Sequence, residues 1–220
     1  MNLYDIMGPV MVGPSSSHTA GAVRIGFISR KLLGEKVQEA EILFHGSFLA
    51  TGTGHGTDRA VMAGLLGMAQ DDLGIPKSLQ IAQKERIKWK FGKVHLKEVH
   101  PNSVKLLLTG EHGKKLEIIA SSPGGGRVVI CRMDGLETWF SGDVPTLVVH
   151  NDDQPGRVAA VAGQLEKSGI NIASMRLSRN RRAGNAVMVL ECDQQITDKT
   201  VKCIERLKGI EKAACLAGME

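Results

Sequence analysis

Hydroxyl and imidazole side chains gather near the start of the chain in an order that could bind a small carboxylic acid. They follow Pro14 directly and are Ser15, Ser16, Ser17, His18 and Thr19. Apolar residues recur after them at three- and four-residue steps, which predicts a helix beginning here. The first amides of a helix have no partner within it and attract anions, and histidine exchanges a proton near neutral pH. One serine is enough to cap a helix, so we predict a carboxylate site. Surplus surface serines beside an ordinary cap are the alternative.

A second group of candidate binding residues lies in a glycine-rich segment. It sits between a strand predicted at residues 40–48 and a helix for which Thr57 or Asp58 would be the N-cap. Glycine lets a backbone approach a ligand closely, and a helix start offers a second place for an anion. The candidate substrate-binding residues here are Gly54, His55, Gly56 and Thr57. The spacing matches neither the phosphate-binding loop nor the dinucleotide fingerprint, so a purely structural loop stays open.

Two further segments carry weaker signals. Residues 121–126 hold two serines, a proline and three glycines, which predicts a turn, with backbone amides in a shared site as the alternative. Arg179, Arg181 and Arg182 predict a solvated hairpin turn, with RNA binding as the alternative. The net charge of +5 is spread along the chain, and aromatic residues make up only 4% of it. We see no aromatic stacking platform and expect no nucleic-acid partner.

The four cysteines do not suggest a metal site in this chain. They are Cys131, Cys192, Cys203 and Cys215. None forms a C-x-x-C pair, and their spacing suits neither a zinc ribbon nor a complete iron–sulfur site. We predict four reduced thiols, mostly buried. The sequence has no recognisable signal peptide and no apolar stretch near the ~20 residues of a membrane span, so we expect a cytoplasmic protein without a membrane partner.

The elements that must position these residues fall into two predicted domains, residues 1–142 and 146–220. In the first, helices precede a run of alternating strands, and Gly34 should end the helix that follows His18. Tight turns at residues 110–113 and at Asp134-Gly135 predict hairpins. We therefore predict an α+β domain whose helices pack on a mostly antiparallel sheet.

The second domain has a clearer pattern of elements. Strands are predicted at residues 146–151, 170–178, 185–192 and 211–216, and helices from Pro155 to Gly169 and over residues 197–207. The order is β-α-β-β-α-β, the ferredoxin-like arrangement, in about 75 residues. One sheet face would be open to pair with another copy.

Three motifs carry a resemblance to a known family. They are Tyr4-Asp5-Ile6-Met7-Gly8-Pro9, Gly13-Pro14-Ser15-Ser16-Ser17-His18-Thr19 and Gly54-His55-Gly56-Thr57-Asp58. Together they look like the β chains of bacterial iron–sulfur L-serine dehydratases, and the resemblance covers the whole chain. The first domain is also similar to the allosteric-substrate-binding domain of some phosphoglycerate dehydrogenases. The second, with Asp153-Gln154-Pro155-Gly156, is similar to ACT domains.

The resemblance implies an enzyme subunit. Members convert L-serine to pyruvate and ammonia with a 4Fe–4S cluster, one iron of which lacks a cysteine and acts as a Lewis acid. In two-chain members a separate cysteine-bearing α chain holds the cluster, so this chain alone should be inactive. The serine-rich motif would then help to bind L-serine. His18 is the candidate catalytic residue, either orienting the substrate or moving a proton, and the catalytic base is left open.

The resemblance also implies regulation. An ACT domain pairs with a second copy and binds a small ligand, here at Asn151, Asp153, Pro155 and Gly156. Arg157 stands where the family usually has an apolar residue, which leaves the ligand's identity open. Two other functions remain possible on these residues: a stand-alone amino-acid sensor without catalysis, and a subunit that regulates a dehydrogenase.

Overall fold

The computed structural model describes residues 10–218, except the side chain of Thr53. The motif at residues 4–9 lies outside the described residues. Contacts divide the chain into two compact units, one up to Cys131 and one from Arg132 onward. The predicted domain limits after residue 142 and before residue 146 stay a prediction.

One sheet of six strands begins in the first unit and ends beyond its limit at Cys131. Its strands are β1 (Val37–His45), β2 (Lys88–Lys93), β3 (Asn102–Gly110), β4 (Lys115–Gly124), β5 (Arg127–Met133) and β6 (Leu136–Phe140). Their order is β2-β1-β3-β4-β5-β6. β2 runs parallel to β1, whereas β1 with β3 and β3 with β4 are antiparallel. Asp134 and Gly135 both have positive φ in the turn before β6, as a tight hairpin requires. The predicted α+β class is confirmed.

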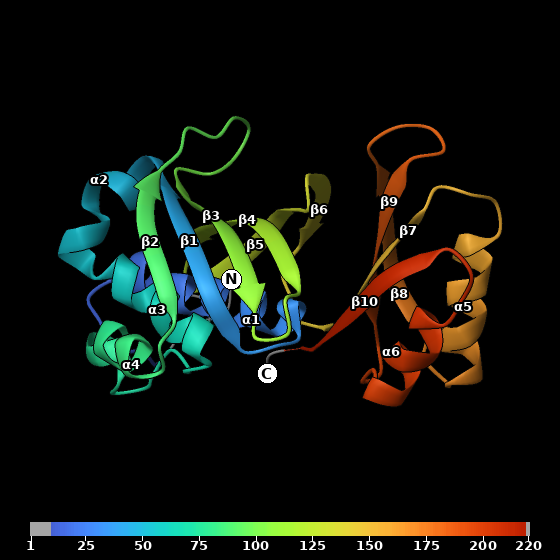
Figure 1. Ribbon diagram of the computed structural model, residues 1–220, viewed down its shortest axis with the longest axis horizontal. Helices are drawn as coiled ribbons and strands as arrows, with labels where there is room; N and C mark the ends of the chain where they lie inside the picture. Colours follow the sequence, from blue (N-terminus) through green and yellow to red (C-terminus); the bar gives the residue numbers. More distant parts are fainter. Residues whose placement is uncertain (1–9, 219–220) are drawn as a thin grey trace, which may run out of the picture. The chain divides into compact units, whose positions relative to one another are not determined.

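Helices occupy the segments before and between the first strands (Figure 1). They are the π-helix η2 (Ser16–Gly21), α1 (Ala22–Leu33), α2 (Gly46–His55), α3 (Thr57–Leu66), the 3-10 helix η3 (Ile75–Lys77) and α4 (Ser78–Lys84). Gly34 ends α1 with a φ of 71°, as predicted. The helical segment over residues 75–84 was not predicted.

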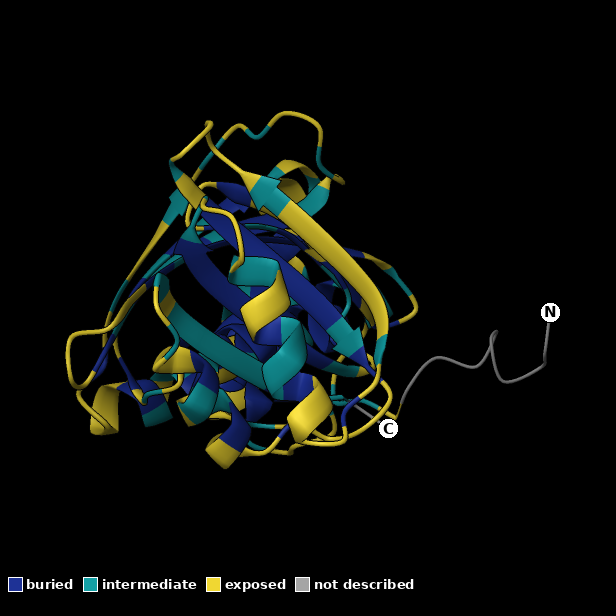
Figure 2. Cartoon of the chain, turned by 90° about the vertical axis from the view of Figure 1, so that its right-hand side faces the viewer, coloured by how far each residue is buried: buried dark blue, intermediate teal, exposed yellow. Residues whose placement is uncertain are grey.

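The core of this unit lies between the sheet and α1 with α3. Ile42, Leu106 and Ile118 stand side by side in the β1, β3 and β4 register, and none of them is exposed. Figure 2 colours the chain by burial, and buried strand segments appear in dark blue while many loops are exposed and yellow. α1 and α3 approach each other closely through Gly26 and Gly64, because a Cβ at either position would overlap the other helix's backbone. The close packing fixes the two helices that carry the predicted motifs.

Two predictions for this region were wrong in part. They are the strand at residues 40–48 and the glycine-rich loop after it. β1 ends at His45, and Gly46, with a φ of 53°, turns the chain directly into α2. Gly52 and Gly54 therefore lie in a helix, although glycine disfavours one by roughly 1 kcal/mol relative to alanine. Burial of Phe48, only 1% exposed, supports α2 against this cost. The N-cap of α3 is Gly56, not Thr57 or Asp58.

The second unit contains the predicted β-α-β-β-α-β order. Its elements are β7 (Pro145–Asp152), α5 (Arg157–Lys167), β8 (Ile172–Arg179), β9 (Asn185–Cys192), α6 (Asp198–Glu205) and β10 (Ile210–Ala217). The strand order is β10-β7-β9-β8, the ferredoxin-like order. Buried apolar side chains of β7 and β9 pack with Leu165 of α5 and Ile204 of α6. No helix in the described part of the chain is long and apolar enough to cross a membrane.

Candidate functional site

The serine-rich motif forms the entry to η2. Ser15 is its N-cap in extended conformation, and its hydroxyl accepts a hydrogen bond from the His18 amide at 3.2 Å. The Thr19 amide donates to the Ser15 carbonyl at 2.9 Å. Ser16 and Ser17 are half-buried in the first turn. Hydroxyl groups and the amides of a helix start therefore meet at one place, as an anion site requires.

The ring of His18 is held from both sides. Its Nδ1 lies 3.1 Å from the Ser17 hydroxyl. Its Nε2 lies 3.0 Å from the Thr51 hydroxyl and 3.3 Å from the Ser47 hydroxyl, both on α2. Two helices far apart in the sequence thus fix one imidazole.

The hydrogen-bond partners also indicate where the proton sits on His18. Thr51 has a single hydroxyl proton and donates it to the Ser47 carbonyl at 3.0 Å. Its oxygen is left to accept from Nε2 of His18. A neutral ring then carries its proton on Nε2 and a lone pair on Nδ1, to which the Ser17 hydroxyl donates. This tautomer follows from the pattern of donors and acceptors.

Burial favours the neutral form of this ring. His18 is 9% exposed, and the edge of the Phe48 ring packs against it with centroids 5.1 Å apart. Desolvation lowers the pKa of His18 from its ordinary value, a backbone hydrogen bond with Ser47 opposes the shift, and the nearby His55 adds to it. His18 is therefore a neutral imidazole at pH 7, able to accept a proton.

A second histidine stands beside the first. The His55 ring lies 5.1 Å from the His18 ring, centroid to centroid. Its Nδ1 is 3.0 Å from the Thr51 carbonyl, and a carbonyl can only accept, so Nδ1 carries a proton and the neutral ring has a lone pair on Nε2. The Thr19 hydroxyl donates to the His55 carbonyl at 3.3 Å. The structure thus brings the two predicted clusters together at His18 and His55.

The remaining predicted residues of the second cluster have different environments. Gly54 is exposed in the last turn of α2. Gly56, with a φ of 68°, joins α2 to α3. Thr57 is fully buried at the start of α3, and its hydroxyl has no hydrogen-bond partner among residues 10–218. Gly56 and Thr57 therefore shape the junction behind His55, while Gly54 faces solvent.

The segment at residues 121–126 contributes to the support of η2. β4 continues through Ser122, and only Gly125 and Gly126 form the turn. Ser122 is fully buried, and a Cβ added at Gly21 would overlap its side chain. Ser122 thus packs against the end of η2 that lies away from the serines.

Ser47 and Thr51 were missed from the sequence. They precede His55 at intervals of four residues, which places all three on one face of a helix. The prediction of a strand up to residue 48 hid this spacing. A helical interpretation of residues 46–55 would have revealed it.

The loop after β7 holds the predicted regulatory residues. Asn151 is buried; its amide donates to the Asp152 carbonyl at 2.6 Å, and its Oδ1 has no partner among the described residues. Asp153 accepts from Arg179 at 2.8 Å and from the Ala183 amide at 3.0 Å. The hydrogen bond from Arg179 is the main cause that lowers the pKa of Asp153.

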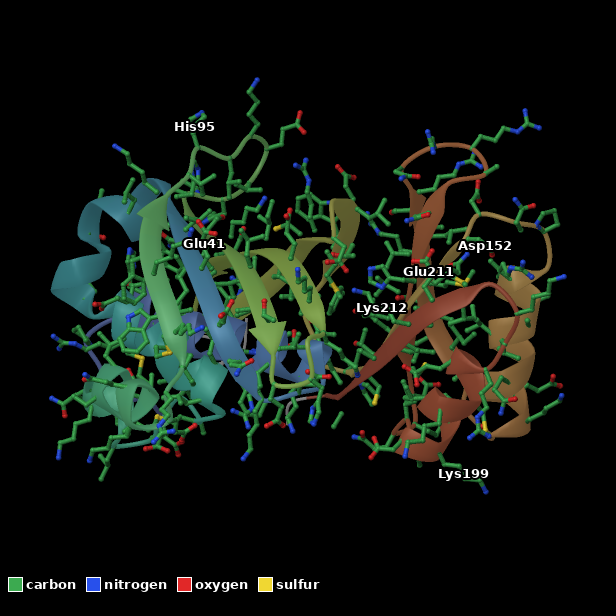
Figure 3. The ribbon with its side chains drawn as sticks, viewed as in Figure 1. Glu41, His95, Asp152, Lys199, Glu211 and Lys212 are labelled. Atoms are coloured by element: carbon green, nitrogen blue, oxygen red, sulfur yellow. The ribbon has the colours of Figure 1, made fainter. Side chains whose placement is uncertain are left out.

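Arg157, the departure from the family pattern, has a structural partner. Its guanidinium donates to Asp152 through Nη2 at 2.9 Å, and Asp152 is labelled near the start of α5 in Figure 3. The bond from Arg157 lowers the pKa of Asp152. Pro155 and Gly156 are exposed, and Gly156 caps α5 with a φ of 89°.

The residues that the structure describes do not fit an iron–sulfur cluster. Within residues 10–218 no three His, Cys, Asp or Glu side chains are arranged to hold a metal ion. The cysteines are thiols, two buried and two partly buried, on separate elements. Cys131 hydrogen-bonds with Ser121 at 3.3 Å.

Two family models match this chain, each over a separate part of the sequence. The family described as serine dehydratase beta chain matches residues 3–132, and the ACT domain family matches residues 146–209. A probable L-serine dehydratase beta chain from Bacillus subtilis is 39% identical over 98% of each chain. The L-serine dehydratase beta chain of Peptoniphilus asaccharolyticus is 35% identical over 95% of this chain and 93% of that one.

A more distant relative is much longer than this chain. A D-3-phosphoglycerate dehydrogenase from Methanocaldococcus jannaschii is 26% identical over 89% of this chain but only 37% of its own length. The family match over residues 3–132 and the two full-length relatives decide the assignment. The chain belongs to the serine dehydratase beta chain family and carries an ACT domain.

Proposed function

We propose that this chain is the β chain of an L-serine dehydratase and supplies the His18 part of its substrate site. One observation carries the proposal. A neutral, buried imidazole is fixed at both nitrogens by Ser17 and Thr51, beside a helix start rich in hydroxyl groups. Such a ring is too well oriented for an ordinary surface histidine, and it lies in a chain of the matching family.

The substrate carboxylate would bind at the start of η2. The unsatisfied amides of the first turn and the hydroxyls of Ser15 and Ser16 can donate to it. Ser15, Ser16 and Ser17 are all half-buried at this end of η2. Serine, with one carboxylate and a short hydroxyl side chain, matches such a small polar site.

The dehydration requires two departures from serine: the α-proton and the β-hydroxyl. Loss of both as water leaves 2-aminoacrylate, whose imine form hydrolyses to pyruvate and ammonia. As the Ser17 oxygen takes the α-proton, the Ser17 hydroxyl can pass its own proton to the Nδ1 lone pair of His18, to which it is hydrogen-bonded. That proton then leaves with the β-hydroxyl as water. Nε2 stays bonded to Thr51, which keeps the ring oriented during the transfer.

We place the 4Fe–4S cluster on a separate, cysteine-bearing α chain. The donor set of this chain does not fit a cluster, and the two closely matching relatives are named as beta chains. A cluster iron would supply Lewis-acid chemistry to the substrate. The His18 site would then be half of an active site completed by that partner.

The deciding experiment is anaerobic pyruvate formation from L-serine by the chain isolated with its partner. We expect activity with an iron-containing partner and none from the chain alone. His18→Ala should lower kcat at least about 100-fold, as loss of a proton-transfer group does. An intact, iron-loaded complex without activity would instead indicate a non-catalytic amino-acid sensor.

A matched pair at Thr51 tests how His18 is held. Thr51→Val removes the hydroxyl that orients the ring and should lower kcat about tenfold. Thr51→Ser keeps the hydroxyl and should retain most of the activity. Equal rates in the two variants would show that the bond to His18 has no role in turnover.

We also propose that the ACT domain regulates the enzyme through the loop after β7. Asn151 supports this assignment, since its buried Oδ1 has no hydrogen-bond partner in the described part of the chain and a ligand could provide one. Asp153 is engaged with Arg179 and the Ala183 amide, so its role is to hold the loop against the hairpin. Pro155 and Gly156 would border the ligand. Deletion of residues 146–220 that left the rate profile unchanged would contradict this regulation.

Pairing of two ACT domains would occur along β8. This strand is an edge of its sheet. Met175 and Leu177 pair with Leu190 and Met188 of β9 and so point to the same sheet face, the one that packs with the helices. Both are nearly half exposed, at 47% and 46%. A second copy adding its own β8 would cover them.

A further inference from the structure

A separate cavity opens on the other face of α2. Its volume is about 370 Å³, and its lining includes Phe44, Phe48, Leu49, Asp58, Phe91 and Lys93. In the sheet register Phe91 lies beside Ile42 and Lys93 beside Phe44, which places them on the face covered by α2 and α3. Cavities of this size hold small molecules in other proteins.

Three aromatic rings form the apolar part of this pocket. The Phe44 and Phe91 rings stack with centroids 6.0 Å apart, and the Phe48 ring meets Phe44 edge-on at 6.5 Å. Leu49 and Phe91 at the mouth are 45% and 39% exposed. A ligand with an apolar group would cover this surface, and its burial would stabilise the complex.

Two opposite charges complete the lining. Asp58 belongs to the first turn of α3 and Lys93 to the end of β2. Lys90 on the same strand is paired with Glu41, labelled in Figure 3, at 3.0 Å, whereas Lys93 stands opposite the apolar Phe44. A carboxylate beside the single cation disfavours phosphorylated ligands. Asp58 and Lys93 together suit a zwitterion, whose ammonium would bind Asp58 and whose carboxylate would bind Lys93.

We propose that this pocket binds a free amino acid with an apolar side chain, such as leucine or phenylalanine, and that its occupancy changes turnover at the His18 site. The side chain lies among the three phenylalanine rings, and the backbone charges lie between Asp58 and Lys93. Serine, which lacks an apolar side chain, leaves the rings uncovered and binds weakly here.

α2 connects the pocket to His18. Ser47 and Thr51 on one face of the helix hold the imidazole, while Phe48 and Leu49 line the pocket. Phe48 contacts both sites directly, because its ring also packs against His18. A ligand that presses on Phe48 therefore moves or stiffens the helix that orients the imidazole. This coupling rests on the proposed function of the His18 site, whereas binding to the pocket does not.

Calorimetry with the full chain tests the binding itself. L-leucine or L-phenylalanine should bind saturably, with a Kd of about 1 mM or tighter. 4-Methylpentanoate, which lacks the ammonium group, and leucinamide, which lacks the carboxylate, should each bind at least about tenfold more weakly than L-leucine. Lys93→Gln should weaken binding similarly, and Lys90→Gln, on the same strand, should leave it unchanged. No binding at about 10 mM, or equal binding by the two variants, would overturn the proposal.

Kinetics with the assembled enzyme tests the coupling. The amino acid that binds the chain should change the KM for L-serine by about fivefold, a typical coupling between two sites. Lys93→Gln should abolish the change, whereas Lys90→Gln, on the same strand but outside the pocket, should retain it. If binding to the chain disappears in the assembled enzyme, the pocket is a docking surface for the partner and the effector role is wrong. An assembled enzyme that does not turn over L-serine contradicts the proposed function. The calorimetry still tests whether the pocket binds an amino acid.

Discussion

At His18 the surroundings decide the charge of the ring. Burial beside Phe48 and the neighbouring His55 lower its pKa, and the backbone hydrogen bond with Ser47 compensates only in part. A neutral imidazole with its lone pair on Nδ1 is the result. The same side chain at a solvated helix start would be partly charged near pH 6.5 and free to rotate.

The lowered pKa predicts a pH dependence of stability. Between the lowered value and about 6.5, the unfolded chain binds a proton at residue 18 that the folded chain does not. The contribution of His18 is therefore present above pH ~6.5 and is lost as the pH falls through the folded-state pKa. Urea unfolding at several pH values should show this loss in the wild-type chain and its absence in His18→Gln.

A control variant shows whether this pH dependence belongs to His18 or follows from the loss of any histidine side chain. His112 lies in the turn between β3 and β4, and its side chain is 76% exposed. His112→Gln should keep the difference between neutral and acidic pH that His18→Gln removes. A wild-type dependence that survives in His18→Gln would show that other groups cause it.

Among the elements, the contact between α1 and α3 fixes the site's geometry. α1 continues directly from η2, and α3 follows directly from the end of α2 through Gly56. Gly26 and Gly64 let the two helices touch backbone to backbone. Movement of either helix would separate His18 from Thr51.

Replacing a glycine at this contact by alanine should therefore lower the stability of the chain and disturb the His18 site. A Cβ at Gly64 would overlap the Val23 carbonyl, so Gly64→Ala should lower the free energy of unfolding by about 1–3 kcal/mol, the usual cost of overpacking. Gly163→Ala is the control, since Gly163 lies within α5 and a Cβ there has open space. That change should stabilise the chain by up to about 1 kcal/mol. Equal effects in denaturant unfolding would refute the close-contact explanation.

For the whole molecule, function depends on surfaces that this chain leaves open. Under these proposals, an α chain would complete the half-site at η2, and a second copy of the chain would cover the β8 edge. Each unit is otherwise complete, with its own buried core. Assembly should then change activity and regulation more than it changes the fold of either unit.

The β8 edge gives a direct test of pairing. Leu177→Asp places a charge on the surface that a second copy would cover, and it should reduce the molar mass measured by light scattering to that of the unpaired form. Lys199→Asp, on α6 (Figure 3), introduces the same carboxylate away from β8 and should leave the mass unchanged. An unaltered mass for Leu177→Asp would contradict pairing through β8.

The sequence by itself determined the elements that depend on local patterns. The alternation of apolar residues and the turn residues predicted the β-α-β-β-α-β order of the second unit, where β9 has the predicted bounds. Gly34 and Asp134-Gly135 marked the end of α1 and a hairpin, because positive φ is a local requirement. Ser15 and His18 were predicted as site residues because hydroxyl and imidazole groups at a helix start have a definite chemistry, and their role in a site stays a prediction.

Only the tertiary structure decided how the candidate residues meet. α2 contains three glycines and was not predicted, since burial of Phe48 against the sheet outweighs its weak local preference for helix. That helix brings Ser47 and Thr51 to His18 and creates the aromatic pocket on its other face. Contacts between residues about thirty positions apart have no local signature in a sequence, because they follow from the packing of helices on a sheet.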